Sequence, residues 1–358
     1  MHAIRLACAF CAMLALSCAC GFHYGAQAMN ADSQARASES TPPVVTAAEP
    51  PSPPFGGGAP SPGVLVRPGD NAVDVIINGE LFTRYVFAGA AKPYCWRLIG
   101  PTGTPVTRAY PMETVAGEAE DHPHQKSMWF THGDVNDVDF WGEGEESGTQ
   151  VHRAFEILES GPLFGTIRAR NDWLGPDGKK ICEDVRELRF YNVPGVRLFD
   201  FEITVLATEG PVTFGDTKEG TFGFRVAQTM TVDGGQGHIE NSRGDRDGET
   251  WGKAAEWCDY YGPVEGETAG IAVMDHPQNL RHPTYWHVRT YGLFAANPFG
   301  LSYFVGEGND GSYTVPAGGS LTLRYRVMIH RGSTAEAGVA QAYAAYTQPP
   351  AITLSPSP

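Results

Sequence analysis

Val196-Arg-Leu-Phe-Asp-Phe-Glu-Ile-Thr-Val205 alternates apolar and polar side chains over most of its length. The stretch before it, Val185-Arg-Glu-Leu-Arg-Phe-Tyr191, has a similar alternation, and the turn-forming residues from Asn192 to Gly195 separate the two. Successive side chains of a β-strand point to opposite faces of the sheet. The pattern therefore predicts two antiparallel strands that bury one face and expose the other.

Further stretches extend this prediction to the rest of the chain. Asn78-Gly79 lies between two apolar runs in residues 73–82 and is typical of a tight β-hairpin. Residues 321–330 alternate again after a turn at Ala317-Gly-Gly319. A helix is expected for Ser333 to Tyr346, where Ser and Thr precede an alanine-rich body. We therefore predict an all-β, mainly antiparallel protein, a large β-sandwich or supersandwich with a short C-terminal helix.

Residues 1–28 have the features of an export signal, because a positively charged start precedes an apolar run that is too short to cross a bilayer. Two cleavage sites remain open. Ala15-Leu-Ser-Cys18 resembles a bacterial lipobox, which would end the signal at residue 17 and attach a lipid to Cys18. Ala26-Gln-Ala28 fits an ordinary signal peptidase site. Both predict an exported protein, either a lipoprotein of the cell envelope or a periplasmic or secreted protein, and only the lipid anchor would bring it to a membrane.

Composition divides the rest of the 358-residue chain into three parts. Residues 29–63 are rich in Pro, Ala, Ser and Gly, which predicts a flexible tether. We interpret residues 64–347 as a single β-rich domain and residues 348–358 as a tail. The net charge of −15 argues against a nucleic-acid partner. We find no P-loop, dinucleotide-binding glycine pattern or serine nucleophile elbow, so we expect neither a nucleotide cofactor nor serine-hydrolase chemistry.

Three cysteines, Cys95, Cys182 and Cys258, lie in the predicted β domain. They are too few and too scattered for a disulfide framework, although a bridge between two of them remains open in an exported protein. None of them belongs to a Cys-x-x-Cys pair, so a zinc site with thiolate ligands is not expected.

Residues 121–141 combine three histidines, four aspartates and two tryptophans. A packed core does not accommodate so many titratable groups, because each buried polar group needs a partner. Such a mixture is typical of a pocket with apolar walls and a few polar groups. If the segment around Pro123 forms a strand, His122 and His124 point to the same face. His132-Gly133-Asp134 is interpreted either as part of this site or as a turn with a capping aspartate.

A second segment, residues 216–225, places Lys218 next to Glu219 and Gly220. On a strand the two charged side chains would face opposite ways, but on a turn closed by Gly220 they could serve one pocket. Glu219 could then act as a general base, if burial raises the pKa of its carboxyl group. The alternative is a solvated Lys-Glu pair.

A third segment, residues 275–300, contains a second Asp-His-Pro. The two Asp-His-Pro segments could face each other across one cleft. In the third segment His287 alternates with Arg289 and Tyr291, and these three side chains would line one face with donors suited to hydroxyls or carboxylates.

The chain resembles a bacterial family of uncharacterised secreted proteins labelled "methane oxygenase PmoA"-like. The matching stretches are residues 121–141, 217–220, 257–260 and 275–300. The label does not fit this chain, because the methane monooxygenase membrane subunit has many membrane-spanning helices and the apolar runs here are too short. The family often has Arg in place of Lys126 and Gly in place of Asp137. The resemblance implies a β-rich exported domain, often found in bacteria that degrade polysaccharides, without an assigned reaction.

Our leading hypothesis is an exported carbohydrate-processing protein, a hydrolase, lyase or epimerase with acid–base chemistry on a sugar. His124 or His287 would protonate a sugar oxygen, Glu219 would accept a proton, and His132 or Asp134 would orient the acid. A glycan or other small molecule is thus the expected ligand. The predicted substrate-binding residues are Trp129, Asn136, Trp141, Lys218, Asn279, Arg289, Tyr291 and Asn297, with the tryptophans stacking on the sugar ring.

Two hypotheses from other classes remain open. The first is a metal-dependent oxidoreductase, in which His122, His124 and one of His132, His276 or His287, with or without Asp134, would bind a transition metal. The His-x-His spacing supports it only weakly, since that pattern also occurs without a metal. The second is a non-catalytic glycan-binding module, in which the tryptophans bind the ligand and the histidines are structural.

Overall fold

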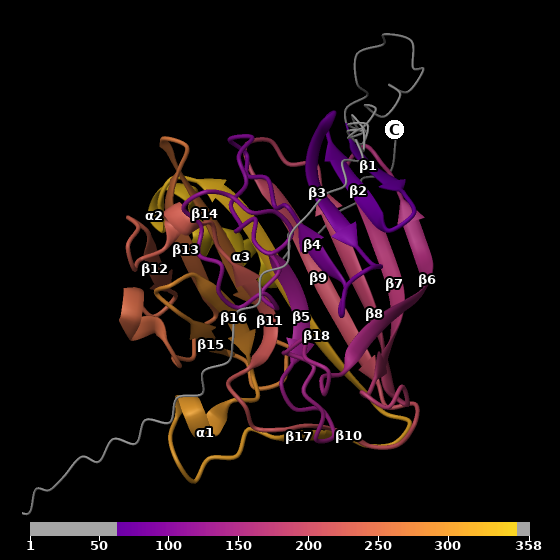
Figure 1. Cartoon of the computed structure of the whole chain (residues 1–358). Helices are drawn as coiled ribbons and strands as arrows, with labels where there is room; N and C mark the ends of the chain where they lie inside the picture. Colours follow the sequence, from indigo (N-terminus) through magenta and orange to yellow (C-terminus); the bar gives the residue numbers. More distant parts are fainter. Residues whose placement is uncertain (1–62, 349–358) are drawn as a thin grey trace, which may run out of the picture. The chain divides into compact units, whose positions relative to one another are not determined.

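The computed structural model describes residues 63–348. The predicted export signal, Cys18, nearly all of the predicted tether and residues 349–358 lie outside the described residues. From Val64 to Thr347 the chain forms strands and short helices (Figure 1). Within this range no helix is long and apolar enough to cross a membrane.

The first sheet has eight antiparallel strands drawn from distant parts of the sequence. In spatial order they are β1 (Val64–Pro68), β2 (Ala72–Ile77), β3 (Glu80–Val86), β4 (Tyr94–Trp96), β5 (Met128–His132), β11 (Gly220–Arg225), β16 (Leu293–Asn297) and β15 (Tyr285–Val288). This order brings the three segments singled out in the sequence onto neighbouring strands, since β11 pairs with both β5 and β16.

The second sheet is also antiparallel and has eight strands. In spatial order they are β12 (His238–Asn241), β13 (Trp257–Val264), β14 (Glu267–Asp275), β18 (Ser320–Arg331), β9 (Arg197–Leu206), β8 (Lys180–Tyr191), β7 (Phe164–Leu174) and β6 (Thr149–Glu159). A small pair, β10 (Val212–Phe214) and β17 (Tyr313–Val315), lies apart from both sheets in the hydrogen-bonding order. The predicted all-β, antiparallel fold class is confirmed.

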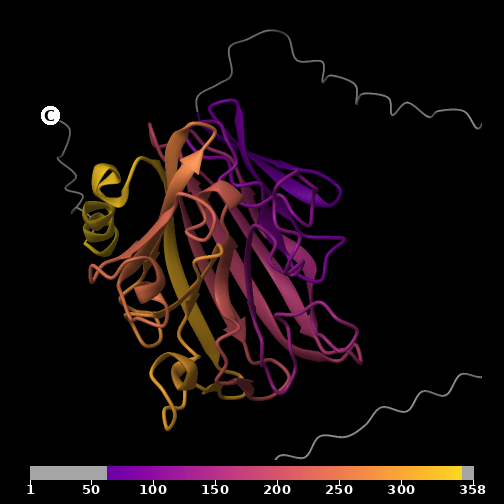
Figure 2. The same ribbon diagram turned by 60° about the vertical axis from the view of Figure 1, so that its left-hand side comes forward.

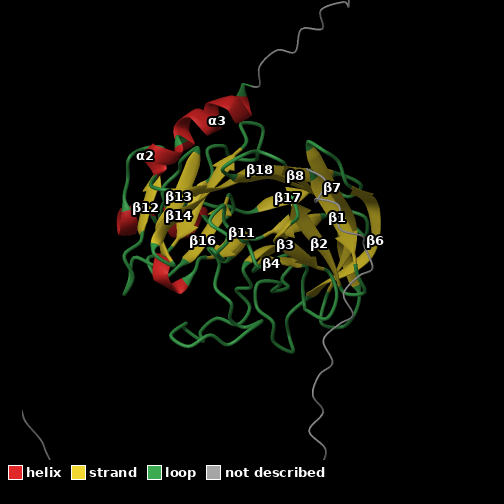
Figure 3. Cartoon of the chain, turned by 90° about the horizontal axis from the view of Figure 1, so that it is seen from above, coloured by secondary structure: helices red, strands yellow, loops and turns green. Residues whose placement is uncertain are grey.

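The two large sheets form two layers with the main apolar core between them (Figure 3). Along β9, Phe199, Phe201 and Ile203 point into this core while the side chains between them are partly exposed, as the alternation predicts. Phe201 stacks on Phe222 of the first sheet, with ring centroids 4.5 Å apart. Burying an aromatic side chain of this size contributes roughly 1.5–3 kcal/mol, so contacts of this kind hold the layers together.

The predicted hairpin at Asn78-Gly79 joins β2 to β3. The φ angles of Asn78 and Gly79 are 53° and 87°. A two-residue hairpin turn needs this left-handed conformation to match the right-handed twist of its two strands. Asn and Gly adopt it with the least steric cost, which explains why this dipeptide occupies the turn.

The C-terminal helical segment is divided into two helices, where the sequence predicted one. They are α2 (Thr334–Ala337) and α3 (Val339–Thr347), and Gly338 between them has a φ angle of 66° that ends the first helix. Ser333 caps α2 in a reciprocal capping box with Glu336, so the predicted Ser-Thr start is confirmed. The pair packs outside the second sheet (Figure 2), where Val339 joins a small apolar cluster with residues of β13, β14 and β18.

The remaining helices are short: the 3-10 helices η1 (Gln228–Met230) and η2 (Asp247–Thr250), and α1 (Leu301–Phe304).

Around α2, a buried polar cluster fixes the helix to the sheet. Asp259 of β13 accepts a hydrogen bond from Thr334 at 2.7 Å and pairs with His330 of β18 at 3.1 Å. Burial disfavours the charge of His330, but the neighbouring Asp259 carboxylate outweighs it and raises the pKa of His330.

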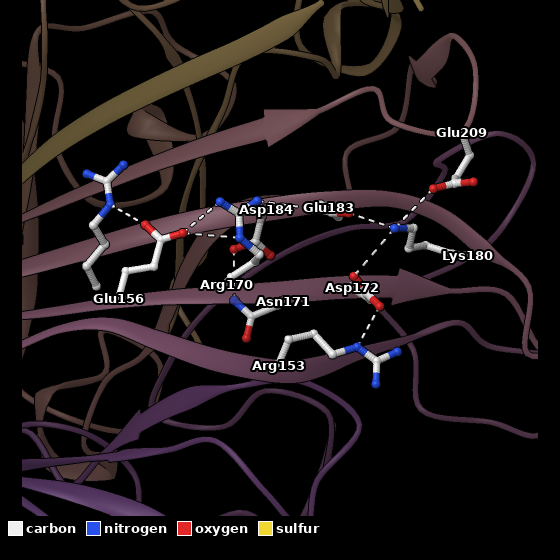
Figure 4. A network of polar contacts seen from close by, with 10 residues as sticks. Arg153, Glu156, Arg170, Asn171, Asp172, Lys180, Glu183, Asp184 and Glu209 are labelled. Carbon is white, nitrogen blue, oxygen red and sulfur yellow. Dashed lines mark hydrogen bonds and ion pairs between the residues drawn. The ribbon is translucent and has the colours of Figure 1, made fainter. Parts of the chain in front are cut away.

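The outward-facing side chains of β6, β7 and β8 form a ladder of ion pairs (Figure 4). Arg170 pairs with Glu156 and Glu183, at 2.7 Å and 2.9 Å. Lys180 also pairs with Glu183, at 2.6 Å. Both charge signs are interspersed and matched, which is typical of a solvated face; exposed pairs of this kind contribute at most about 1 kcal/mol each.

The cysteines Cys95, Cys182 and Cys258 are buried and free, so the disulfide that the sequence left open does not form. They lie on three different strands, β4, β8 and β13. Burial raises the pKa of the Cys95 thiol to about 12 and also raises that of Cys182 and Cys258. The thiols are therefore protonated and serve as small apolar core groups.

Candidate functional site

A cavity of about 750 Å³ contains residues from all three segments that the sequence singled out. Its lining residues are His122, His124, Gln125, Gly133, Asp139, Trp141, Gly142, Lys218, Glu219, His287, Arg289 and Tyr291. A volume of this size is within the range of small-molecule sites.

The cavity lies on the face of the first sheet that points away from the second sheet. In β15, Trp286 and Val288 belong to the main core, so His287 between them points to the opposite face. In β5 the same alternation sends Phe130 into the core and Trp129 outward. Trp129 and Trp141 form a separate apolar cluster there, with ring centroids 5.5 Å apart. The site is thus built on the outer face of one sheet and not between the two layers.

The segment that carries His122 and His124 is a turn and not the strand that the sequence pattern considered. His122 has a φ angle of 44°, and its carbonyl accepts a hydrogen bond from Gln125 N–H at 2.9 Å. The turn still brings both rings into the cavity, in an edge-to-face arrangement with centroids 5.7 Å apart.

Asp121 anchors this turn to two buried arginines. Its carboxylate accepts hydrogen bonds from Arg108 and Arg225, the latter at 2.8 Å. Burial raises the pKa of Asp121, but these arginines and the contact with His122 outweigh it and lower the pKa to about 2. Tyr291 stacks on the His122 ring, with ring centroids 5.6 Å apart. The guanidinium of Arg225 in turn lies 4.7 Å from the centroid of the Tyr291 ring. One wall of the cavity is therefore held rigidly.

Lys218 and Glu219 lie on the turn before β11, as expected if this segment forms a turn and not a strand. Asn297 donates hydrogen bonds to the carbonyls of Thr217 and Lys218, both at 3.0 Å, and Glu219 accepts one from Gly133 N–H at 2.7 Å through its carbonyl. A Cβ on Gly133 would come within 2.8 Å of the Glu219 Cβ, so the close approach needs a glycine. The side chains of Lys218 and Glu219 form an ion pair.

Two of the three histidines that line the cavity, His124 and His287, are held neutral near pH 7. Burial lowers the pKa of His124 to about 4, assisted by the charge of Lys92. Burial likewise lowers the pKa of His287 to about 4, with the Glu219 carboxylate opposing the shift. Glu219 also acts on His124 in the same direction. One carboxylate thus lies close enough to both imidazoles to affect their protonation.

Behind His124 lies a group of charges that the sequence did not point to. Lys92 is 2 % exposed and pairs with Glu143 at 2.7 Å, and Lys126 pairs with the same carboxylate. Burial lowers the pKa of Lys92 to about 8. Gln125, which lines the cavity and accepts a hydrogen bond from Arg225, was also missed. No local pattern marks a lysine or a glutamine as buried, so neither was predictable without the tertiary contacts.

Several predicted site residues do not reach the cavity. Trp129 is 1 % exposed under Trp141 and has no free face for a sugar ring. Asn136 is exposed and bonds to Thr213 N–H and the Pro211 carbonyl, beside β10. Asp134 accepts a hydrogen bond from Asp137 N–H at 3.1 Å, which agrees with the alternative of a capping aspartate.

The second Asp-His-Pro does not face the first across the cavity. Asp275 is fully buried and accepts hydrogen bonds from Asn279 at 2.7 Å and from Thr284 N–H at 2.9 Å, and it pairs with His282 at 2.7 Å. Asn279 also bonds to both backbone groups of Arg324 on β18. These residues fix the loop that follows β14, and Asn279 does not line the cavity, so it cannot bind a ligand there. Asn297 is also fully buried, and its side chain bonds to the backbone of the Lys218 turn and does not line the cavity.

His132 is completely buried between Phe214 and Phe299, away from the cavity. Its Nε2–H donates to the Gly215 carbonyl at 2.8 Å, since a carbonyl can only accept, and its Nδ1 has no partner in the described part of the chain. Burial lowers the pKa of His132 to about 4, because a proton on Nδ1 would be buried and unpaired.

This burial predicts an acid-sensitive fold. Between the unfolded pKa of 6.5 and the folded value of about 4, the unfolded state binds more protons, so stability falls with decreasing pH in this window. His132 should contribute at most about 1.4 kcal/mol per pH unit. Urea unfolding of His132→Gln should show a shallower decline from pH 6.5 to pH 4.5, whereas the exposed control His238→Gln should keep the wild-type slope. Equal slopes for both variants would contradict this assignment.

The histidines considered as metal ligands do not form a ligand set in this fold. His122, His124 and His287 line the cavity, but His132 is enclosed in the core and His276 does not line the cavity. Among residues 63–348 no three His, Cys, Asp or Glu side chains lie close enough together to hold a metal ion. The donor set proposed for a metal-dependent oxidoreductase therefore does not fit the geometry.

Fold and site together define an antiparallel β-sandwich with a polar cavity on the outer face of one sheet. The chain belongs to a family of unknown function, DUF6807, which matches residues 72–344. None of the curated proteins matches its sequence.

Solved structures of carbohydrate-active enzymes are similar to part of the chain. The α-galactosidase from Lactobacillus brevis is 8 % identical with a TM-score of 0.37, and the match covers 75 % of this chain and 39 % of that one. The GH36 α-galactosidase AgaA from Geobacillus stearothermophilus is 9 % identical with a TM-score of 0.33, covering 75 % and 41 %. A Glycoside Hydrolase Family 97 enzyme from Pseudoalteromonas sp. strain K8 is 10 % identical with a TM-score of 0.31, covering 75 % and 34 %. The chain thus spans about a third to two fifths of these enzymes, and at these TM-scores we assign no function from them.

Proposed function

We propose that this is an exported carbohydrate-processing protein that binds a sugar in the outer-face cavity and transfers protons to or from it. The observation that carries the proposal is the convergence of Glu219, His124 and His287 on one cavity from three distant segments, with the Glu219 charge acting on both imidazoles. Groups that can exchange protons and that share a concave site are the usual signature of acid–base chemistry.

A sugar fits this cavity better than an apolar ligand. Its hydroxyl groups both donate and accept hydrogen bonds, and the walls offer Gln125, Lys218 and Arg289 as donors beside the carboxylates of Asp139 and Glu219. The aromatic walls serve mainly to enclose the ligand, because Trp141 is 5 % exposed and one face of Tyr291 is stacked on His122.

The roles follow from the protonation states. With pKa values near 4, His124 and His287 are neutral at pH 7, so each has a free ring nitrogen that can accept a proton, whereas the sequence hypothesis gives one of them the role of the acid. Tyr291 keeps its proton, because burial raises the pKa of its phenol, and so it can donate. Lys218 forms an ion pair with the Glu219 carboxylate.

The test is a carbohydrate panel with the purified protein, read by calorimetric binding and by product formation. We expect one sugar class to bind, and the double variant His124→Ala/His287→Ala to lose turnover by roughly 10²-fold or more. His276→Ala, a histidine of the second Asp-His-Pro that does not line the cavity, should behave like the wild type. Binding without turnover in the wild type would reduce the protein to a glycan-binding module. A panel without any binding would overturn the proposal.

A further inference from the structure

Arg289 occupies a fixed position at the rim of β15. It directly follows His287 and Val288 of that strand, and its backbone closes the turn to β16 through hydrogen bonds with Leu293 and Gly292, at 2.7 Å and 3.0 Å. Its guanidinium lies 5.8 Å from the ring centroid of Trp251 and 5.8 Å from that of Tyr291. These two rings restrict the side chain of Arg289, which is one of the residues that line the cavity.

The charge of Arg289 is not balanced by the protein around it. Within residues 63–348, no carboxylate oxygen lies within 4.0 Å of its side-chain nitrogens. The other charged lining groups are engaged: Lys218 pairs with Glu219, and the Asp139 carboxylate accepts hydrogen bonds from the backbone N–H groups of Trp141 and Gly142.

This arrangement is unusual for this chain, which has 41 acidic residues against 26 basic ones. Most of the arginines on the sheet faces have a carboxylate partner, as Arg168, Arg170 and Arg326 do. An arginine held against two aromatic rings, unpaired and facing a cavity, is prepared for an anion supplied from outside.

We propose that the sugar carries a carboxylate, as a uronate does, and that Arg289 binds this group. The inference rests on the proposed function and specifies its substrate class. A guanidinium offers two parallel N–H groups in one plane, which match the two oxygens of a carboxylate. His287 lies on β15 two residues before Arg289, and both residues line the cavity, so the two side chains can contact one ligand. The bound sugar ring would thus extend from Arg289 over His287 toward Glu219.

The experiment compares matched ligands on the purified full chain by calorimetry. Galacturonate and glucuronate oligosaccharides are tested beside their methyl esters, their neutral galactose and glucose counterparts, and a sulfated sugar. We expect uronates to bind roughly 10- to 100-fold more tightly than the esters and neutral sugars, the usual magnitude for a charged hydrogen-bonded pair. Arg289→Met should abolish this preference and Arg289→Lys should keep part of it. Arg153→Met, on the outer face of the second sheet, should leave it unchanged.

The outcomes separate this inference from the proposed function. If neutral sugars and esters bind as tightly as the uronates, the carboxylate inference is overturned while the sugar site stands. A preference for the sulfated sugar over the uronate would overturn it as well. If no sugar binds at all, both are wrong. Because the comparison of acid with ester uses the wild-type protein, a folding defect of the Arg289 variants cannot hide the result.

Discussion

Replacing Arg186 by methionine is expected to lower the free energy of unfolding by about 3–5 kcal/mol, because it leaves a buried carboxylate without its counter-charge. Arg186 and its partner Asp184 lie on the inner face of β8, 2 % and 0 % exposed at their side chains. Their ion pair has an N–O distance of 2.5 Å. The pair is enclosed in the layer between the two sheets, where water cannot solvate Asp184 once the guanidinium is gone.

Three further polar side chains form hydrogen bonds with this pair. Asp184 also accepts hydrogen bonds from Asn171 at 2.9 Å and from the Trp173 indole at 2.7 Å, and Arg186 donates to Gln150 at 2.9 Å. Removing one member of such a network leaves the others partly unsatisfied, which costs more than removing an isolated bond.

A control from the neighbouring strand isolates burial as the cause. Arg168 on β7 forms ion pairs with Glu156 and Glu187, but its side chain is 37 % exposed, so Arg168→Met should cost less than about 1 kcal/mol. Guanidinium chloride unfolding measures both variants. The double variant Asp184→Asn/Arg186→Met should recover part of the loss, because it removes the buried charge. Equal costs for Arg186→Met and Arg168→Met would contradict this account.

The same strand shows how far the sequence defines the fold. The alternation in residues 185–191 was sufficient to predict a strand in an antiparallel sheet, because period two has few other physical explanations. It did not reveal that Arg186 shares the inward face with Leu188 and Phe190, although the spacing of two implies it. A charged residue is normally expected to face solvent. Arg186 can be buried only because Asp184, on the same face of the strand, pairs with it. Asp184 lies outside the alternating stretch and was not considered.

The sequence was sufficient to predict which segments form the site, but not which of their residues line the cavity. The three segments that are rich in titratable and aromatic residues do meet at one cavity, which is lined by His287 of β15 and by the loops and turns beside β5, β11 and β15. Within a segment, however, the sequence does not show which side chains reach the cavity. Trp129 and His132, for example, lie on a strand that is buried along its entire length. A strand covered on both faces has no solvent-facing side that a sequence pattern could reveal.

Replacing Glu219 by glutamine is expected to lower kcat by roughly 10²- to 10⁴-fold, the range for the loss of one proton-transfer group, with a smaller change in sugar affinity. Glutamine keeps the shape of the side chain but cannot accept a proton. The turn itself should persist, because Asn297 and Gly133 hold its backbone and not the carboxylate. The pKa values of His124 and His287 should fall further, since the Glu219 charge that now raises them is removed.

Steady-state kinetics on the sugar found by the panel, together with NMR titration of the two imidazoles, checks both parts of this prediction. A structural role of Glu219 would lower stability and activity together, whereas a chemical role lowers kcat in a protein that unfolds at the wild-type denaturant concentration. Glu267→Gln is the control, because that glutamate pairs with Arg331 in an exposed ion pair at the end of β14. If Glu219→Gln turns over the sugar at the wild-type rate, Glu219 does not transfer a proton. His124 and His287 would then be the remaining candidates for the base, with Tyr291 as the donor.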